Sequence, residues 1–160
     1  MSFTKTVLGF TVAAFMGAAV AQDKRPGYGP AINVSTAKKI AAGAVAECQK
    51  NGWNVAVAIV DPHGTLVYYE KMEDTQYSSA DIAIMKARAA ATYRRPTRVF
   101  AEGINKGSPA TATLPGVVGS PGGVPIFLDG KVIGAAGASG VTGDQDEQCS
   151  KAGVAAAGFQ

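Results

Sequence analysis

The sequence predicts one α+β domain, in which helices pack on an antiparallel sheet of about five strands. A valine-rich stretch at residues 53–61 has apolar side chains on both of its faces, as a central strand does. The dipeptide Asp129-Gly130 joins two further apolar stretches and is a strong hairpin signal. Residues 36–51 repeat small apolar side chains at helical spacing. Because both clear strand pairs are hairpins, we expect an antiparallel sheet covered by helices.

The first 21 residues predict a secretory signal peptide. Lys5 precedes an apolar run at residues 7–20, and Ala19 and Ala21 are small residues at the positions that a signal peptidase reads. A membrane anchor is the alternative, but this run is short and contains glycine. No later apolar run is long enough to span a membrane. We therefore expect the mature chain, which begins at Gln22, in the periplasm or outside the cell.

The composition argues against a strongly charged partner. The chain carries 15 Lys and Arg against 12 Asp and Glu, which gives a net charge of +3. Loss of the signal peptide removes Lys5 and lowers this charge to +2, too little to predict nucleic-acid binding. The chain also has 20 glycines and only one tryptophan. This composition predicts a thin core, with close backbone packing or burial between subunits.

The domain is expected at residues 34–160, after a flexible arm at residues 22–33 that is polar and contains Pro and Gly. Ser35 is expected to cap the first helix, which covers residues 36–51. Gly52 stands where a helix-ending glycine belongs.

The first two strands form a predicted hairpin. Residues 53–61 alternate with period two and are apolar on both sides. The next four residues, from Asp61 to Gly64, fit a type I turn with Pro at its second position. Residues 65–72 then return as the second strand.

The second helix begins at Ser78 or Ser79 and runs to about Tyr93. Its apolar residues occupy nearly the whole circumference, which is typical of a helix buried on more than one side. In a domain this small, that pattern predicts a subunit interface. A shorter helix is expected to start at Pro96 or Thr97 and to end near Asn105.

The last third of the chain is expected to hold a loop, a hairpin and a helix. The loop at residues 107–123 is rich in Gly, Pro, Ser and Thr, and one more short strand is possible at residues 116–123. Strands are predicted at residues 124–128 and 131–138. Acidic residues from Asp144 onward suit the positive end of a final helix.

The two cysteines lie on the predicted buried faces of the first and last helices. Cys48 and Cys149 are an even pair in an exported chain, which favours a disulfide, whereas two buried free thiols are the alternative. The bond would close a loop of about 100 residues and stabilise the fold by about 4 to 5 kcal/mol in the chain-entropy model.

Several residues could carry chemistry, although each also has an ordinary structural explanation. His63 is the only histidine of the chain, and His, Met and Tyr side chains all serve as axial ligands of haem iron. The candidate iron ligands are His63, Met72 and Tyr77. The neighbouring residues Arg94, Arg95 and Arg98 could hold a carboxylate or a propionate, or form salt bridges.

Other kinds of site have weaker support. The glycines from Gly134 to Gly140 lack the G-x-G pair of a nucleotide-binding loop. Hydrolysis by a serine nucleophile lacks its sequence motif, and Cys48 on a buried helix face should be inert. The backbone around Gly122 and Gly123 could present N–H groups to an anion, or simply shape a loop. A carboxylate cluster near the first hairpin could provide an acid and a base, or form a solvated rim.

Several segments together resemble the GlcG/HbpS family of haem-binding domains. They are V-A-I-V-D-P-H-G-T-L-V, K-M-E-D and the helix segment at residues 79–90, followed by P-G-G-V-P-I, D-G-K-V-I-G-A-A-G-A-S-G and D-E-Q-C-S-K-A-G. The resemblance covers roughly residues 34–158. It implies a five-stranded antiparallel sheet with flanking helices, a homo-oligomer that is often an octamer, and binding of haem or a related tetrapyrrole.

The residues and the resemblance together suggest an exported haem-binding protein for storage, scavenging or sensing. Lys86 or Arg95 would meet the propionates, with Gly122 and Gly123 as further contacts. One of the candidate ligands His63, Met72 and Tyr77 would reach the iron. Two alternatives remain. The chain could be an enzyme that acts on a small organic acid between subunits, using Glu73, Asp81 or Lys86, or it could be a structural oligomer without a ligand.

Overall fold

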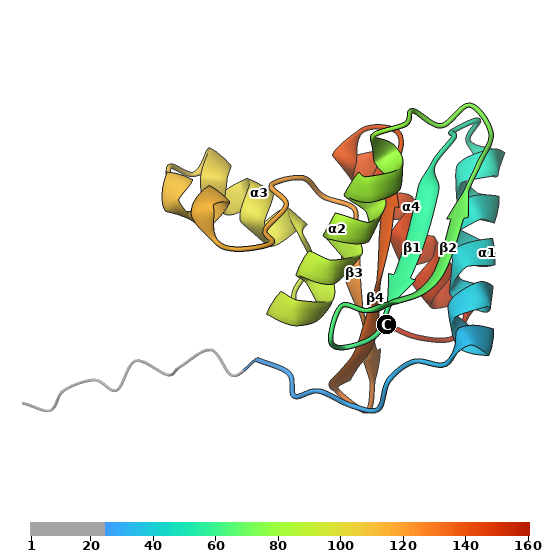
Figure 1. The fold of residues 1–160 in the computed structure, drawn as a ribbon, viewed down its shortest axis with the longest axis horizontal. Helices are drawn as coiled ribbons and strands as arrows, with labels where there is room; N and C mark the ends of the chain where they lie inside the picture. Colours follow the sequence, from blue (N-terminus) through green and yellow to red (C-terminus); the bar gives the residue numbers. More distant parts are fainter. Residues whose placement is uncertain (1–24) are drawn as a thin grey trace, which may run out of the picture.

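The computed structural model describes residues 25–160, so the predicted signal peptide lies outside the described residues. Figure 1 shows a sheet with helices on both of its faces. In chain order, the elements are α1 (Val34–Lys50), β1 (Ala56–Val60), β2 (Leu66–Lys71), α2 (Ser79–Tyr93), α3 (Arg98–Asn105), the 3-10 helix η1 (Pro109–Thr113), β3 (Gly123–Leu128), β4 (Lys131–Ser139) and α4 (Gly143–Ala156). None of the helices in this part of the chain is both long and apolar enough to cross a membrane.

The described chain forms a four-stranded antiparallel sheet in the order β2-β1-β4-β3. The α+β prediction is confirmed, but the expected count of about five strands is wrong for residues 25–160. The suggested extra strand at residues 116–123 is a series of turns, and only Gly123 belongs to a strand. Gly116 and Gly122 have positive φ angles of 72° and 130°, which interrupt an extended backbone.

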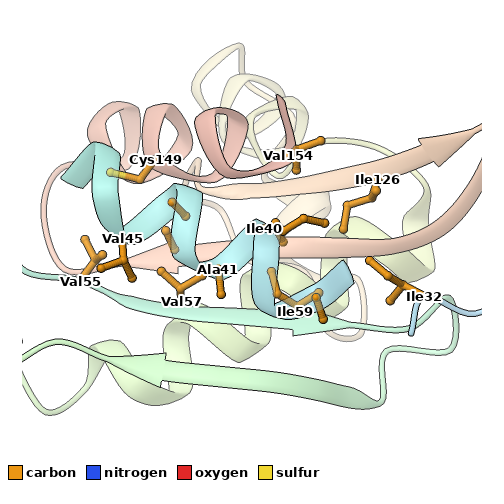
Figure 2. Packing of buried hydrophobic residues seen from close by; sticks show 14 of the residues in the cluster. Ile32, Ile40, Ala41, Val45, Val55, Val57, Ile59, Ile126, Cys149 and Val154 are labelled. Carbon is orange, nitrogen blue, oxygen red and sulfur yellow. The ribbon is translucent and has the colours of Figure 1, made fainter. Parts of the chain in front are cut away.

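The strand β1 is buried on both faces, as its sequence predicts. Val57 and Ile59 face α1 and α4, and Figure 2 shows them packed with Ile40 of α1 and Ile126 of β3. Ala58 and Val60 face the opposite side, where the alanines of α2 cover them. The sheet is therefore the middle of three layers, with α1 and α4 on one face and α2 on the other.

The first helix begins one residue before Ser35, the predicted cap. Asn33 is the cap, because its side-chain oxygen accepts a hydrogen bond of 2.9 Å from the Thr36 N–H. Gly52 follows the helix with a φ of 70°, in the left-handed conformation expected of a helix-ending glycine.

The segment before α1 contacts the sheet beyond the end of β1. Tyr28 forms a parallel bridge with Val132 of β4, and the Gly29 N–H donates to the Val132 carbonyl at 2.8 Å. Ile32 is only 6% exposed and joins the core on the α1 side. Part of the predicted arm thus packs against the start of β4.

Both predicted hairpin turns form. The Gly64 N–H donates to the Asp61 carbonyl at 3.0 Å, which closes the type I turn. The Asp61 carboxylate also accepts hydrogen bonds from the N–H groups of His63 and Thr65, at 2.8 and 2.9 Å. At the second turn, Asp129 and Gly130 have φ angles of 49° and 71°, as a type I′ turn requires.

The helices α2 and α3 differ in how much they contact the sheet. α2 buries an alanine-rich face on β1, β3 and β4, while Met85 on its outer side is 47% exposed. α3 and η1 project away from the sheet, as Figure 1 shows, and Phe100 is the buried residue of α3.

The helix α4 starts with a capping box, in which Thr142 and Gln145 each bond the other's backbone N–H. It packs beside α1, where an added Cβ on Gly43 would lie 2.8 Å from the Cβ of Ala156. The predicted disulfide between Cys48 and Cys149 joins these two helices, with a Cα–Cα distance of 5.7 Å. Its sulfur-bearing residues are fully buried.

Candidate functional site

The structure places the three candidate iron ligands at opposite ends of the first hairpin. His63 lies in the turn between β1 and β2, whereas Met72 and Tyr77 lie in the loop that follows β2. In Figure 1, that turn is near the lower end of the sheet and the loop is at its upper end. One subunit therefore cannot bring His63 and either of the other two to the same iron.

Met72 and Tyr77 have surroundings that do not favour ligation. The Met72 sulfur accepts a hydrogen bond of 3.5 Å from the Val55 N–H, so it points into the fold. Tyr77 is 92% exposed, and the Lys71 ammonium lies 5.4 Å from the centre of its ring. A groove of about 510 Å³ passes Met72 between α1 and the end of β2, and its rim is mostly acidic, with Glu70, Glu73 and Asp74 beside one lysine.

Lys86, Gly122 and Gly123 come together, but in the interior. The Lys86 side chain is 2% exposed, and its ammonium donates to the Asp146 carboxylate at 2.7 Å and to the Ala138 carbonyl at 3.3 Å. An added Cβ on Gly122 would lie 2.9 Å from the Lys86 nitrogen, and one on Gly123 would overlap the Lys86 carbonyl oxygen. The two glycines thus make room for Lys86, whose buried amine has no exposed surface to offer a propionate.

The ion pair of Lys86 anchors the start of α4. The Asp146 carboxylate also accepts a hydrogen bond of 3.1 Å from the Val141 N–H. Burial raises the pKa of Asp146, and this effect exceeds the opposing influence of the Lys86 ammonium and of the hydrogen bonds to its carboxylate. A buried charge needs such partners, because an isolated one would be very costly to desolvate.

A second ion-pair group lies next to this one, at the surface. Arg98 of α3 contacts Asp144 at 2.5 Å and Glu147 at 2.6 Å, and Lys151 also pairs with Glu147. The carboxylates of Asp144 and then Glu147 raise the pKa of Arg98. Because Arg98 is already paired, the arginine that best suits a negatively charged ligand must be sought elsewhere.

The C-terminal end of α2 carries a different group of side chains, which we call the arginine–aromatic surface: Tyr28, Tyr93, Arg94, Arg95 and Phe100. The Arg94 guanidinium lies 5.0 Å from the centre of the Tyr28 ring, and that of Arg95 lies 5.6 Å from the centre of the Phe100 ring. Tyr93 and Phe100 meet edge to face at 5.2 Å.

Backbone contacts hold this surface in place. Arg94 ends α2 in the left-handed conformation, with a φ of 56°, and donates to the Pro26 carbonyl at 2.9 Å. The Tyr28 hydroxyl donates to the Thr92 carbonyl at 2.8 Å, and the Tyr93 hydroxyl donates to the Pro115 carbonyl at 2.8 Å. The surface therefore joins α2 to the N-terminal segment on one side and to the loop after η1 on the other.

The arginine–aromatic surface has positive charge without a negative neighbour. Within residues 25–160, neither Arg94 nor Arg95 has a salt bridge, and the same holds for nearby Arg25 and Arg88. The Nε atoms of Arg94 and Arg95 are buried and lack a hydrogen-bond acceptor in this part of the chain. Both residues are half-buried, so the exposed part of each guanidinium is open to the carboxylate of an anionic ligand, which would supply the missing charge.

The turn that contains His63 packs against the last turns of α2. The Arg88 guanidinium donates to the carbonyl of Gly64, the residue after His63, at 3.0 Å. An added Cβ on Gly64 would lie 3.4 Å from a methyl carbon of Thr92, the residue whose carbonyl Tyr28 contacts. The His63 residue is exposed, and only its backbone N–H is used by the turn. Of the predicted ligands, it is the one whose neighbour in the chain contacts an arginine of α2.

The structure also identifies residues that sequence reasoning missed. Tyr28 belongs to the predicted arm, and only the bridge to β4 brings it to α2. Asp146 was expected to favour the helix start, but its main contact is Lys86, 60 residues away. For Asp146 a sequence signal did exist, since Lys86 lies among the alanines of a helix that its sequence predicts to be buried, and a buried lysine needs a partner.

The residues proposed for acid–base chemistry are not assembled into one site. Glu73 lines the acidic groove, Asp81 is exposed on α2 near Tyr69, and Lys86 is buried with Asp146. Residues 25–160 contain no group of three or more His, Cys, Asp or Glu side chains that could hold a metal ion.

Comparisons with solved structures agree with this fold. HbpS is 30% identical with a TM-score of 0.73, and the alignment covers 90% of this chain and 97% of that one. The PduOC:heme complex is 27% identical with a TM-score of 0.74 and covers 81% and 97%. Klebsiella pneumoniae ORFY has a TM-score of 0.76 at 22% identity, covers 87% and 97%, and supports the fold alone.

Sequence comparisons extend the agreement. Protein GlcG of Escherichia coli K12 is 43% identical over 103 residues, which are 64% of this chain and 77% of that protein. A 15.0 kDa protein from the dhaT-dhaS intergenic region of Citrobacter freundii is 33% identical over 72% of this chain and 84% of its own length. The family model described as haem degrading protein HbpS-like matches residues 32–155. The chain therefore belongs to the HbpS-like family.

Proposed function

We propose that this protein binds haem at the arginine–aromatic surface. One observation carries the proposal: Arg94 and Arg95 are neighbouring, half-buried arginines, and neither guanidinium has a carboxylate partner within residues 25–160. Two haem propionates are the kind of anion that such a pair can hold. The family match and the haem complex of PduOC support the same ligand.

The neighbouring side chains suit the rest of the haem molecule. Val99 and Leu114, next to Phe100 and Pro115 in the sequence, are exposed apolar residues that could cover part of a macrocycle. Haem iron accepts an axial nitrogen ligand, and His63 is exposed in a turn whose next residue, Gly64, contacts Arg88 of α2. In this proposal Arg94 and Arg95 hold the propionates and His63 meets the iron.

Titration of the purified protein with haemin tests the site. We expect a shifted Soret band for the wild type, and a dissociation constant about 10- to 100-fold larger for Arg95→Gln, because a hydrogen bond to a charged group contributes about 1.5 to 3 kcal/mol. Lys106→Gln is the matched control, since it removes one positive charge from an exposed i,i+4 pair on α3. Equal affinities for Arg95→Gln and Lys106→Gln, or a band identical to that of free haemin, would refute the proposed site.

Iron ligation is tested separately with haemin-loaded variants. Resonance Raman and absorbance spectra should change for His63→Ala and should stay the same for Tyr77→Phe and Met72→Ala. The two controls alter residues at the far end of the hairpin. A spectrum that changes with Met72→Ala and not with His63→Ala would assign the ligand to the other end.

Export, storage, scavenging or sensing, and self-association belong to the same proposal. The signal-like residues 1–21 support export, and mass spectrometry of protein recovered from the periplasm would show whether the chain begins at Gln22. Self-association is supported by the outer side of α2, where Met85 is exposed between the half-buried Ile82 and Ile84. Light scattering coupled to gel filtration would give the number of subunits.

A further inference from the structure

The two edges of the sheet are treated differently by the rest of the chain. The Ala138 N–H of β4 donates to the Gly122 carbonyl just before β3. Because backbone groups along an antiparallel strand point alternately toward and away from the partner strand, those of Gly123, Pro125 and Phe127 face away from β4. At each of these positions, the chain itself bonds or lacks the N–H group that an added strand would use. Thr97 bonds both the N–H and the carbonyl of Gly123, Pro125 has no N–H, and the Phe127 N–H donates to the Gln160 carbonyl at 3.0 Å.

The β2 edge is not closed in this way. The Met72 N–H donates to the Val55 carbonyl at 3.0 Å, so alternation along the strand turns the backbone groups of Glu70 toward β1 and those of Tyr69 and Lys71 outward. Within residues 25–160, no hydrogen bond reaches these outward groups of Tyr69 and Lys71. An open edge of this kind is a template for pairing with another strand.

The side chains around this edge also leave room for a neighbour. α2 packs mainly on β1, β3 and β4, whereas β2 lies at the margin of the sheet. Tyr69 is only partly buried there, against the α2 layer. We propose that β2 pairs in an antiparallel manner with β2 of a second copy of this chain, which extends the sheet across a two-fold axis.

The charges on β2 disfavour two registers of this pairing. Like charges directly opposite each other destabilise a strand pair. An axis at Glu70 would oppose two glutamates, and an axis at Lys71 would oppose two lysines. Among the registers without such clashes we choose the axis at Tyr69, because it alone sets each Glu70 against Tyr68 of the other copy. Tyr68 and Glu70 already hydrogen-bond within one chain at 3.2 Å, so their chemistry is compatible.

This inference does not rest on haem binding, and it is tested on protein without haem. In the proposed register, the Tyr69 Cα atoms of the two copies face each other at about 5.5 Å, within the range that a disulfide spans. We expect Tyr69→Cys to form a cross-linked dimer on mild oxidation. Lys71→Cys is the matched control, because its two copies would lie about 13 Å apart along the strands. The native disulfide is fully buried and should not exchange with the new cysteine.

A second measurement covers the case in which Tyr69→Cys folds poorly. Lys71→Pro removes an outward N–H without touching a bond to β1, so its circular dichroism should stay native while its mass in solution falls relative to the wild type. A wild type that is monomeric by light scattering would overturn the inference. Cross-linking of Lys71→Cys as fast as Tyr69→Cys, or an unchanged mass for folded Lys71→Pro, would also overturn it. None of these results bears on haemin affinity, so the two proposals can fail independently.

Discussion

Lys86 and Arg95 are nine residues apart, and the sequence made both of them candidates for the same ligand. In the structure they have opposite surroundings. Lys86 is 2% exposed and bonded to a carboxylate that is also 2% exposed. Arg95 stacks over Phe100 at the end of α2 with no carboxylate beside it in the described chain. A positive side chain is thus a structural element in one place and an available contact in the other.

This difference shows that the groups around a positive side chain, and not its type, decide whether it stabilises the fold or is free to contact a ligand. A buried ammonium is tolerated because Asp146 and the Ala138 carbonyl replace water around it. The guanidiniums of Arg94 and Arg95 keep some exposure, and aromatic rings support them without neutralising them. The buried ion pair and the arginine–aromatic surface should therefore respond differently to substitution and to pH.

The largest effect is expected when the buried pair is broken. Asp146→Ala leaves the Lys86 ammonium buried without its carboxylate, which should lower the free energy of unfolding by about 3 to 5 kcal/mol. Urea denaturation followed by circular dichroism measures the change. Replacing both residues together, as Lys86→Met with Asp146→Leu, should cost much less, because no lone charge remains. Equal losses for the single and the double variant would contradict the importance of pairing.

A smaller loss is expected from the glycine that makes room for Lys86. In Gly123→Ala, the new Cβ would overlap the Lys86 carbonyl oxygen and approach a methyl carbon of Thr97 at 2.7 Å. The backbone must shift, at a cost of about 1 to 3 kcal/mol in thermal or urea denaturation. Gly27→Ala is the control, since an added Cβ there has no neighbour within 4 Å. If both variants are equally stable, Gly123 is not needed for close packing.

The pH dependence of stability should report on Asp146. Burial raises the pKa of Asp146 in the folded protein. At a pH between the unfolded and the folded pKa, the folded protein therefore keeps a proton on this carboxyl group that the unfolded chain has lost. The stability contributed by protonated Asp146 is therefore complete at a pH below the unfolded pKa, which is about 3.9. It is lost as the pH rises through the raised pKa of the folded protein. Asp146→Asn lacks this titration, so the difference in unfolding free energy between wild type and variant should change across that range. A difference that is independent of pH would contradict the shift.

The smallest effect on stability is expected at the arginine–aromatic surface. Arg95→Gln removes no ion pair, so its free energy of unfolding should stay within about 0.5 kcal/mol of the wild type. The same variant is expected to lose haemin affinity, which sharpens the contrast with Asp146→Ala. Differential scanning calorimetry of the protein without haem provides the measurement. A large loss of stability would mean that Arg95 has a structural role like that of Lys86.

Most of the local structure could be predicted because its causes are local. Asp61, Pro62 and Gly64 specify a turn through their own backbone preferences, and Asp129-Gly130 does the same for the second hairpin. The double burial of β1 follows from apolar residues at every position. The disulfide was one of two options that the cysteine count allowed, and the packing of α1 on α4 brings its sulfurs together.

The errors arose where distant segments meet. Asn33 caps α1 in place of Ser35, because the segment that crosses β4 fixes where the helix can start. The count of strands was too high because residues 116–122 form turns, with Gly122 placed against Lys86 and β4. Lys86 was assigned to a ligand because its partner Asp146 is 60 residues away in the sequence.

The sequence by itself determined the α+β class, the two hairpins, the helices and the family resemblance, since each depends on short-range patterns of residues. Only the tertiary structure decided which charges are paired. It buried Lys86 with Asp146, left Arg94 and Arg95 without a carboxylate in the described chain, and put His63 and Met72 at opposite ends of the first hairpin. The physical reason is that the cost of a charge depends on its burial and its partners, and residues far apart in the chain supply both.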